Sequence, residues 1–146
     1  DTAELTGTVR TFDEAIREMV LRRVRETVEG TALAIGAQAE LTVDEIAIAV
    51  VNDPAAAARV RKAASGVVGV DHVSADQRWM ASEDMAYFLR RVPGCFFFIG
   101  GSRTPDEHTH HHPKFDFDEA VLAQGVAILC ETVVGYLKTN DCDSTD

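Results

Sequence analysis

Four histidines crowd the stretch DEHTHHHPKFDFDE, which runs from residue 106 to residue 119. Imidazole is a good ligand for zinc, manganese and similar ions, and a neutral ring suffices for binding. The stretch lies inside the chain and is interrupted by Thr109, so a purification tag does not explain it. Residue types alone leave two interpretations open, a metal-binding loop and a solvated polar loop. The histidines concerned are His108, His110, His111 and His112.

The proline at position 113 limits how many of these rings can reach one ion. A proline disfavours helical backbone in the residue before it, so His112 is expected to be extended. Neighbouring side chains of an extended stretch point in opposite directions. We therefore expect one or two of these histidines, and not the whole run, to bind a common ion.

Acidic side chains beside the histidines could complete a metal site, but a helix start explains several of them better. Carboxylates are favoured at the cap and in the first turn of a helix, where they accept hydrogen bonds from free amides. We expect this structural role for Asp116, Asp118 and Glu119. Asp106 and Glu107 have no such explanation.

Strand and helix patterns around this loop predict an α/β protein. Apolar and polar residues alternate in 39–51, and β-branched residues favour a strand in 3–12. The continuously apolar stretch 95–101 indicates a strand buried on both faces, and 70–79 is a weaker strand or a loop. Four helices are expected. The first runs from a capping box at Thr11 and Glu14 to Gly36, and the second from a cap at Asn52 or Asp53 to Gly66. The third runs from Ser82 to Pro93, and the fourth begins at residues 116–118.

Apolar stripes assign a buried side to the two long helices. In the first the stripe is Ile16, Val20, Val24 and Val28, and in the last it is Leu122, Val126, Leu129, Val133 and Leu137. Side chains at this spacing lie on one face of a helix. Gly125 and Gly135 are expected to let the last helix approach the sheet closely.

Composition narrows the class of partner. The formal net charge of -10 argues against nucleic acid and anionic membranes, which require clustered lysine and arginine. We expect no membrane span and no secretory signal. The three cysteines show no C-x-x-C spacing, which argues against a zinc knuckle or a disulfide framework. A reduced, cytoplasmic location fits best.

Three stretches, in this order, resemble one family. They are AELTGTVRTFDEAIR near the start, MASEDMAYFLRRVPGCFFFIG in the middle and HHPKFDFDEAVLAQGVAIL in the last third. Together they are similar to the metal-dependent aminoacylase and carboxypeptidase-like amidohydrolases, in the branch of the hippurate and auxin-conjugate hydrolases. The resemblance covers almost the whole chain.

The resemblance implies an architecture with two parts. Residues 1–52 are similar to the second half of an inserted lid domain, built of antiparallel strands and helices, which often mediates dimers. Residues 53–146 are similar to the C-terminal part of a two-metal, α/β catalytic domain. The expected fold class is thus α/β with an α+β lid remnant.

The resemblance also assigns two site residues and leaves others missing. His111, two positions before the proline, matches a metal ligand of the family. Arg10, in the G-T-x-R pattern, matches an arginine that holds the substrate carboxylate. The C-x-H pair, the Glu-Glu pair with its general base and a further histidine do not occur in this sequence. No catalytic residue is therefore expected in the chain.

The expected activity of the complete enzyme is hydrolysis of the amide bond of N-acyl amino acids or small peptides, with two divalent ions such as zinc or manganese. This chain is expected to be a fragment that is inactive alone, and the complete enzyme a homodimer through the lid. One alternative is a non-catalytic dimerisation or metal-binding module. Another is an unrelated small α/β protein whose His108, His110 and His112 bind metal jointly.

Overall fold

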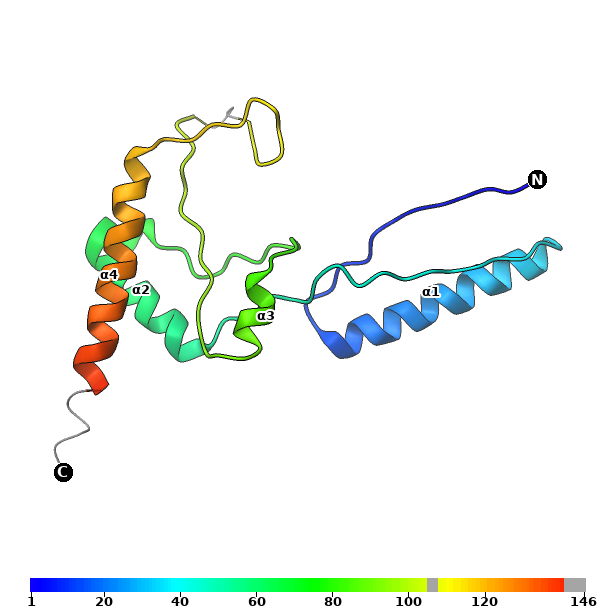
Figure 1. Cartoon of the computed structure of the whole chain (residues 1–146), viewed down its shortest axis with the longest axis horizontal. Helices are drawn as coiled ribbons and strands as arrows, with labels where there is room; N and C mark the ends of the chain where they lie inside the picture. Colours follow the sequence, from blue (N-terminus) through cyan, green and yellow to red (C-terminus); the bar gives the residue numbers. More distant parts are fainter. Residues whose placement is uncertain (105–107, 141–146) are drawn as a thin grey trace. The chain divides into compact units, whose positions relative to one another are not determined.

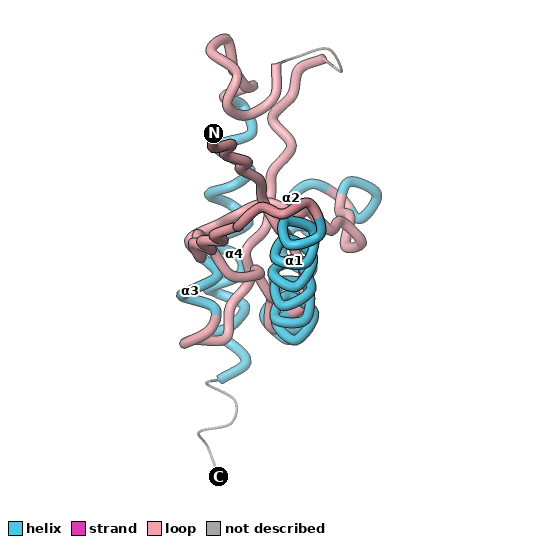
Figure 2. The backbone as a smooth tube through the Cα atoms, turned by 90° about the vertical axis from the view of Figure 1, so that its right-hand side faces the viewer, coloured by secondary structure: helices cyan, strands magenta, loops and turns pink. Residues whose placement is uncertain are grey.

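The computed structural model describes residues 1–104 and 108–140. Its helices are α1 (Glu14–Ala34), α2 (Pro54–Val68), a short 3-10 helix η1 (Val70–His72), α3 (Met85–Leu89) and α4 (Ala120–Asn140) (Figure 1). Figure 2 shows these helices joined by long loops, and no strand is present among the described residues.

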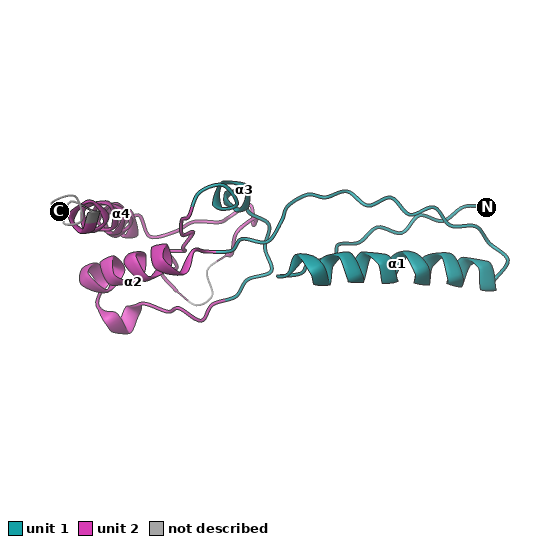
Figure 3. Cartoon of the chain, turned by 90° about the horizontal axis from the view of Figure 1, so that it is seen from below, with its two compact units in different colours: residues 1–51, 78–92 teal, residues 52–77, 93–146 magenta. Residues whose placement is uncertain are grey.

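The chain divides into two compact units, which are drawn in different colours in Figure 3. Unit 1 comprises residues 1–51 and 78–92, and unit 2 comprises residues 52–77 and 93–146. The boundaries of these two units differ from those of the expected lid (1–52) and catalytic part (53–146), because residues 78–92 group with the N-terminal residues. The lid and catalytic assignments stay predictions.

The stretches expected to be strands are extended or irregular instead. This corrects the expectation of strands in 3–12, 39–51 and 95–101. The described residues form helices and no strand, so the expected α/β class is not seen in them. Backbone hydrogen bonds do not join residues 1–12 to residues 37–51 in the described structure. A strand exists only when a neighbour accepts and donates its ladder hydrogen bonds, and alternation alone cannot supply that neighbour.

In unit 1, α1 begins at an acidic cap. Asp13 is the N-cap, and its carboxylate accepts a hydrogen bond from the Ile16 amide at 2.9 Å. The expected capping box at Thr11 is therefore wrong, because the Asp13 carboxylate bonds the third residue after it. The expected stop at Gly36 is confirmed, with φ of 73° and an amide bonded to the Leu33 carbonyl at 3.1 Å.

The extended stretch after α1 runs back along the helix (Figures 1 and 3). The guanidinium of Arg17 bridges the two, with carboxylate oxygens of Glu14 at 2.5 Å and Glu45 at 2.8 Å. The α1 stripe that was expected to be buried is only half-buried at Val20 and Val24, and Ile16 is 51% exposed. α3 is shorter than expected, and Ser82 does not cap it, since its N-cap is Asp84.

In unit 2, α2 and α4 lie side by side (Figures 1 and 3). The α2 start matches the expectation: Asp53 accepts a hydrogen bond from the Ala56 amide at 2.8 Å, and Pro54 is the first helical residue. α2 ends at Val68, before Gly69 at φ of 88°, two residues beyond the expected Gly66.

Residue Asn52 ties the segment that starts at Gly94 to the beginning of α2. Its side-chain amide donates to the Phe96 carbonyl and accepts from the Phe96 amide, both at 2.8 Å. The Asp53 amide adds a hydrogen bond to the Gly94 carbonyl at 2.9 Å. This clamp gives the segment the backbone partners that a neighbouring strand would otherwise provide.

α4 packs against the rest of unit 2 with a different side than expected. Ile128 is 4% exposed and Gly125 lies against Ile99, so close that a Cβ at Gly125 would stand 2.8 Å from Ile99 Cδ1. Gly135 has no such neighbour. The five stripe residues that were expected in the core are 54–62% exposed: Leu122, Val126, Leu129, Val133 and Leu137. The close approach at Gly125 selects the buried side.

α4 is also long and apolar enough to cross a membrane by length and composition, over Ala120–Thr139 with a mean hydropathy of 1.7. This corrects the expectation that no stretch reaches that length. Core helices of soluble proteins pass the same test, but they are mostly buried, whereas only 6% of this window is buried. The guanidinium of Arg59 in α2 lies 5.2 Å from the ring centre of Tyr136, near the C-terminal end of α4.

Candidate functional site

The histidine loop is built from two consecutive turns. The His112 amide donates to the Thr109 carbonyl at 3.2 Å, and the Phe115 amide donates to the His112 carbonyl at 2.9 Å. The expectation of an extended run is wrong for His110 and His111, which are the central residues of the first turn. His112 precedes Pro113 as the first residue of the second turn. Asp106 and Glu107 lie outside the described residues.

Three of the four loop histidines have ring partners. The rings of His108 and His112 stack with centres 3.7 Å apart and planes 12° apart. His112 Nδ1 also accepts a hydrogen bond from the Lys114 amide at 3.0 Å, and His110 meets the Phe115 ring edge-on at 5.1 Å. A ring nitrogen binds a metal in the plane of its ring, so the stacked pair cannot converge on one ion in this arrangement.

His111 differs from its neighbours in two respects. Its φ of 68° is the only positive value outside glycine in the described chain. Its exposed side chain makes no hydrogen bond and no ring contact with any residue in 1–104 or 108–140. A left-handed residue other than glycine carries about 1–2 kcal/mol of strain. The imidazole at 111 is thus held on a strained backbone with its nitrogens unused.

Four residues close the base of this loop. The Asp118 amide donates to the Gly101 carbonyl at 2.8 Å, and Arg103 forms an ion pair with Asp116. The Asp116 carboxylate also accepts from the Phe117 amide at 2.9 Å. The hydrogen bond from Arg103 is the largest of the interactions that hold the pKa of Asp116 below its ordinary value. We call Gly101, Arg103, Asp116 and Asp118 the loop base.

The acidic residues after the loop divide into two roles. Asp118 accepts a hydrogen bond from the Ala120 amide at 2.9 Å, so its expected role at the helix start is confirmed. Asp116 instead pairs with Arg103, which sequence analysis missed. The two are 13 residues apart, and no local pattern signals a pair at that separation.

Arg10 lies in unit 1, in the extended stretch before α1. Its Nη1 donates to the Thr8 hydroxyl at 2.9 Å, and the residue is exposed. A guanidinium has five donors in a planar fork. The hydrogen bond to Thr8 uses one nitrogen and leaves Nη2 and Nε available for a carboxylate.

The donor set for a metal is incomplete in this chain. Among the described residues, no three or more histidine, cysteine, aspartate or glutamate side chains are grouped so that they could hold an ion. His111 fits as a single ligand, since its imidazole is exposed and unengaged. Tight binding of zinc takes three or four protein ligands. A tight zinc site that included His111 would need ligands from outside the described residues.

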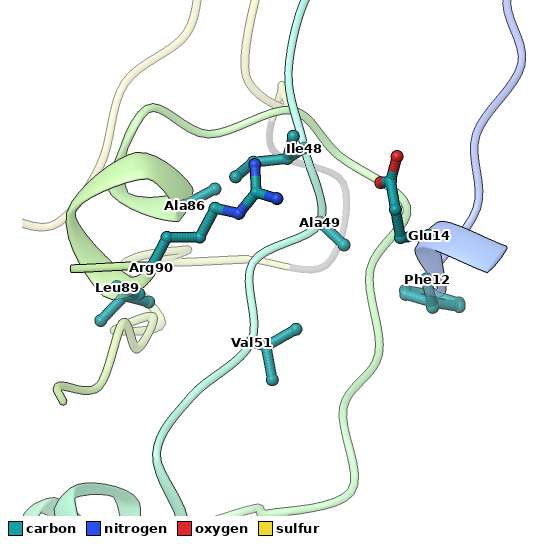
Figure 4. A pocket seen from close by; sticks show the side chains of 8 residues that line it. All are labelled: Phe12, Glu14, Ile48, Ala49, Val51, Ala86, Leu89 and Arg90. Atoms are coloured by element: carbon teal, nitrogen blue, oxygen red, sulfur yellow. The ribbon is translucent and has the colours of Figure 1, made fainter. Parts of the chain in front are cut away.

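A small cavity of about 160 Å³ lies in unit 1 (Figure 4). Apolar side chains line most of it, with Glu14 and Arg90 as its charged members. The hydrogen bond from Arg17 is the largest of the interactions that keep the carboxyl pKa of Glu14 below its ordinary 4.5.

Comparison with known proteins places the chain in a family. The profile described as Peptidase family M20/M25/M40 matches residues 5–134. The chain is 36% identical over 138 residues to YhaA of Bacillus subtilis (strain 168), which is named as an amidohydrolase. That match covers 93% of the chain and 35% of YhaA.

Two further relatives carry names that specify a reaction. The chain is 32% identical to the N-acetyl-L-cysteine deacetylase of Bacillus subtilis (strain 168), over 97% of the chain and 33% of that protein. It is 33% identical to the N-acetyldiaminopimelate deacetylase of Enterococcus faecalis (strain ATCC 700802 / V583), over 95% and 35%.

The chain thus spans about a third of the length of the curated relatives that it matches. Members of the matched family are in general hydrolases that depend on divalent metals. The resemblance to the metal-dependent amidohydrolases, noted from three motifs, is confirmed at the level of the family, and an unrelated α/β protein with a histidine sensor loop is excluded. The branch of the hippurate and auxin-conjugate hydrolases stays a prediction. The chain belongs to peptidase family M20/M25/M40.

Proposed function

We propose that the full-length protein containing this chain hydrolyses the amide bond of N-acyl amino acids. In this proposal residues 1–52 are part of a lid that forms a homodimer, and residues 53–146 are part of the catalytic domain. His111 is one ligand of a centre with two divalent ions, and Arg10 holds the carboxylate of the amino acid. The names of the relatives, which are amidohydrolases and deacetylases, support the reaction class.

The observation that supports His111 most directly is its lack of partners. The other loop histidines are engaged by a ring or a backbone amide, whereas the imidazole of His111 is exposed and its backbone is left-handed. Strained backbone at a single residue recurs at ligand-binding positions. A ligand in the complete enzyme would use the nitrogen that this conformation leaves free.

The chain's own groups would contribute binding and orientation. The metal centre, when bound, lowers the pKa of a water and stabilises negative charge on the carbonyl oxygen. The neutral His111 ring would donate one lone pair to it. The Arg10 guanidinium would bind a carboxylate through two parallel hydrogen bonds, which fixes the position of the amide relative to the metal. The general base is not supplied by this chain.

The metal ligand can be tested in the full-length protein with His111→Asn and a control at an exposed histidine outside the loop, His72→Asn. Asparagine tolerates a left-handed backbone, so the first variant removes the imidazole and keeps the loop conformation. We expect His111→Asn to retain half of the bound metal and to lose more than about 100-fold in turnover of N-benzoylglycine, since even indirect partners of a ligand cost 10–100-fold. Full metal content in His111→Asn would refute the proposal.

The Arg10 role has its own test. We expect Arg10→Ala to raise the KM for N-acetyl and N-benzoyl amino acids about tenfold or more, because a charge-assisted hydrogen bond contributes roughly 1.5–3 kcal/mol. For the corresponding amino acid amides, which have no carboxylate, the KM should stay the same. Equal losses on both substrate classes would contradict a role in carboxylate binding.

The isolated chain is expected to hydrolyse nothing and to bind metal weakly. Calorimetric titration with zinc or manganese, together with an assay on N-benzoylglycine, tests this. Tight stoichiometric binding without turnover would favour the alternative, a non-catalytic metal-binding or dimerisation module. Turnover at the rate of a complete enzyme would overturn the assignment of a fragment.

A further inference from the structure

We propose that the ion pair between Arg103 and Asp116 is a positioning device that sets the place and orientation of His111. The inference rests on the proposed role of His111 as a metal ligand. It concerns residues to which neither the family resemblance nor the relatives assign a role. The geometry of the loop base carries it.

The loop base brings two separated stretches together. The Asp118 amide bonds to the Gly101 carbonyl at 2.8 Å, and Arg103 meets Asp116 beside it. A Cβ added to Gly101 would lie 3.2 Å from Phe117 Cβ, so the stretches approach as closely as a glycine permits. In Figure 1 the loop leaves and returns above the start of α4. The loop is thus anchored at both ends to the same point.

Asp116 is oriented as well as anchored. One of its carboxylate oxygens receives the Arg103 guanidinium, and the other accepts from the Phe117 amide at 2.9 Å. A carboxylate bonded on both oxygens cannot rotate without breaking one of these bonds. The backbone that leads into Asp116 therefore has a fixed direction.

The route from Asp116 to His111 passes through Phe115. The Phe115 amide closes the turn onto the His112 carbonyl at 2.9 Å, and the Phe115 ring contacts His110 at 5.1 Å between centres. Both neighbours of His111 are thus attached to the residue that precedes Asp116. If Asp116 moves, the turn and the His110 contact move with it, and His111 lies between them.

The exposure of Arg103 and Asp116 distinguishes a role in positioning His111 from a role in stabilising the fold. The side chains of Arg103 and Asp116 are 48% and 65% exposed. Exposed ion pairs contribute little to global stability, because water screens them and long side chains lose entropy. Removal of the pair should therefore leave the folded state intact and alter only the placement of the loop. Salt should have the same effect, since the screening length is about 3 Å at 1 M.

The test uses the full-length protein loaded with Co²⁺, whose affinity and visible absorption report the ligand geometry. We expect Arg103→Gln and Asp116→Asn to weaken binding of the ion held by His111 about three- to tenfold, less than the 10–100-fold typical of groups bonded directly to a ligand. The absorption bands should shift, and the thermal midpoint of the metal-free protein should stay the same, because weaker ion binding lowers only that of the loaded protein. Arg103→Lys should restore part of the affinity, since it keeps the charge and loses the fork.

The control is Arg23→Gln, which removes a comparably exposed pair with Glu26 on α1. It should change neither affinity nor spectrum. Wild-type affinity and spectrum in both Arg103→Gln and Asp116→Asn would overturn the inference. His111→Asn is measured alongside. If it loses an ion while the two loop-base variants do not, only the positioning role fails. If it loses none, the proposed function fails.

Discussion

Asp116 is a carboxylate whose ionised form is favoured by its surroundings. The hydrogen bond from Arg103 is the main cause, and the Phe117 amide adds to it, so the pKa of Asp116 lies below its ordinary 3.8. A depressed pKa in the folded state means that the pair stabilises the fold above about pH 3.8, and that this contribution is lost as the pH falls through the folded-state pKa. Because both side chains are exposed, the contribution is small.

A carboxyl titration by NMR checks this. We expect Asp116 to titrate below 3.8 in the wild type and to move up toward 3.8 in Arg103→Gln, because the charged donor is gone. If Asp116 titrates at the same pH in both proteins, the ion pair is not formed in solution. Glu14, whose pKa is lowered by Arg17, should be unaffected and serves as the internal control.

Asn52 offers a second test on a single residue. Its side chain makes two hydrogen bonds to the Phe96 backbone, and Asn52→Ala removes both. We expect a loss of about 1–2 kcal/mol in the free energy of unfolding, measured with urea. Asn52→Asp should be as destabilising at pH 7, where a carboxylate faces the Phe96 carbonyl, and less so once acid restores a donor. Equal stability of Asn52→Ala and the wild type would mean that the clamp is replaced by water.

Short-range chemistry let the sequence predict some of these residues and not others. Asp53 at the cap and Pro54 at the first helical position follow from adjacent residue types. At α1 the same rules fit both Thr11 and Asp13, so the local pattern could not choose. The contacts of Asn52 with Phe96 and of Arg103 with Asp116 join residues 44 and 13 positions apart, which only the folded backbone brings together.

Glycines inside α4 test how that helix packs. Gly135 has open space around its missing Cβ, whereas a Cβ at Gly125 would stand 2.8 Å from Ile99 Cδ1. We expect Gly135→Ala to raise the free energy of unfolding by about 0.5–1 kcal/mol through helix propensity. Gly125→Ala should gain less or lose stability, because Ile99 must move. Thermal or urea denaturation measures the difference, and equal gains would contradict the close approach at Gly125.

The positions of the helices along the chain were predictable, but the side that each helix buries was not. The expected helices are all present, because caps and stops are local signals. α4 is apolar on more than one side, so its stripe fitted a core face that the structure instead leaves exposed. Strands could not be predicted, because a strand depends on a distant partner and not on local residue types. The stretches 3–12, 39–51 and 95–101 have strand composition, but ladder partners for them are not formed in the described chain.

Many large apolar side chains are exposed in the part of the chain that the structure describes. The five stripe residues of α4 are each more than half exposed: Leu122, Val126, Leu129, Val133 and Leu137. A contiguous apolar patch of this kind marks a surface that another surface covers. The curated relatives are about three times as long as this chain. We therefore expect the rest of the full-length protein to cover the stripe.

Leu129→Gln separates a covered stripe from a solvated one. In the full-length protein we expect it to lower the free energy of unfolding by about 2–5 kcal/mol, the usual cost when a buried leucine is lost. In the isolated chain the same change should be neutral within about 0.5 kcal/mol, as for other exposed positions, and should reduce binding of a hydrophobic dye.

Leu33→Gln, at a residue 78% exposed on α1, is the control and should be neutral in the isolated chain. A neutral Leu129→Gln in the full-length protein would mean that the stripe stays in water there. Partition of the isolated chain into neutral lipid vesicles would instead favour a membrane for α4.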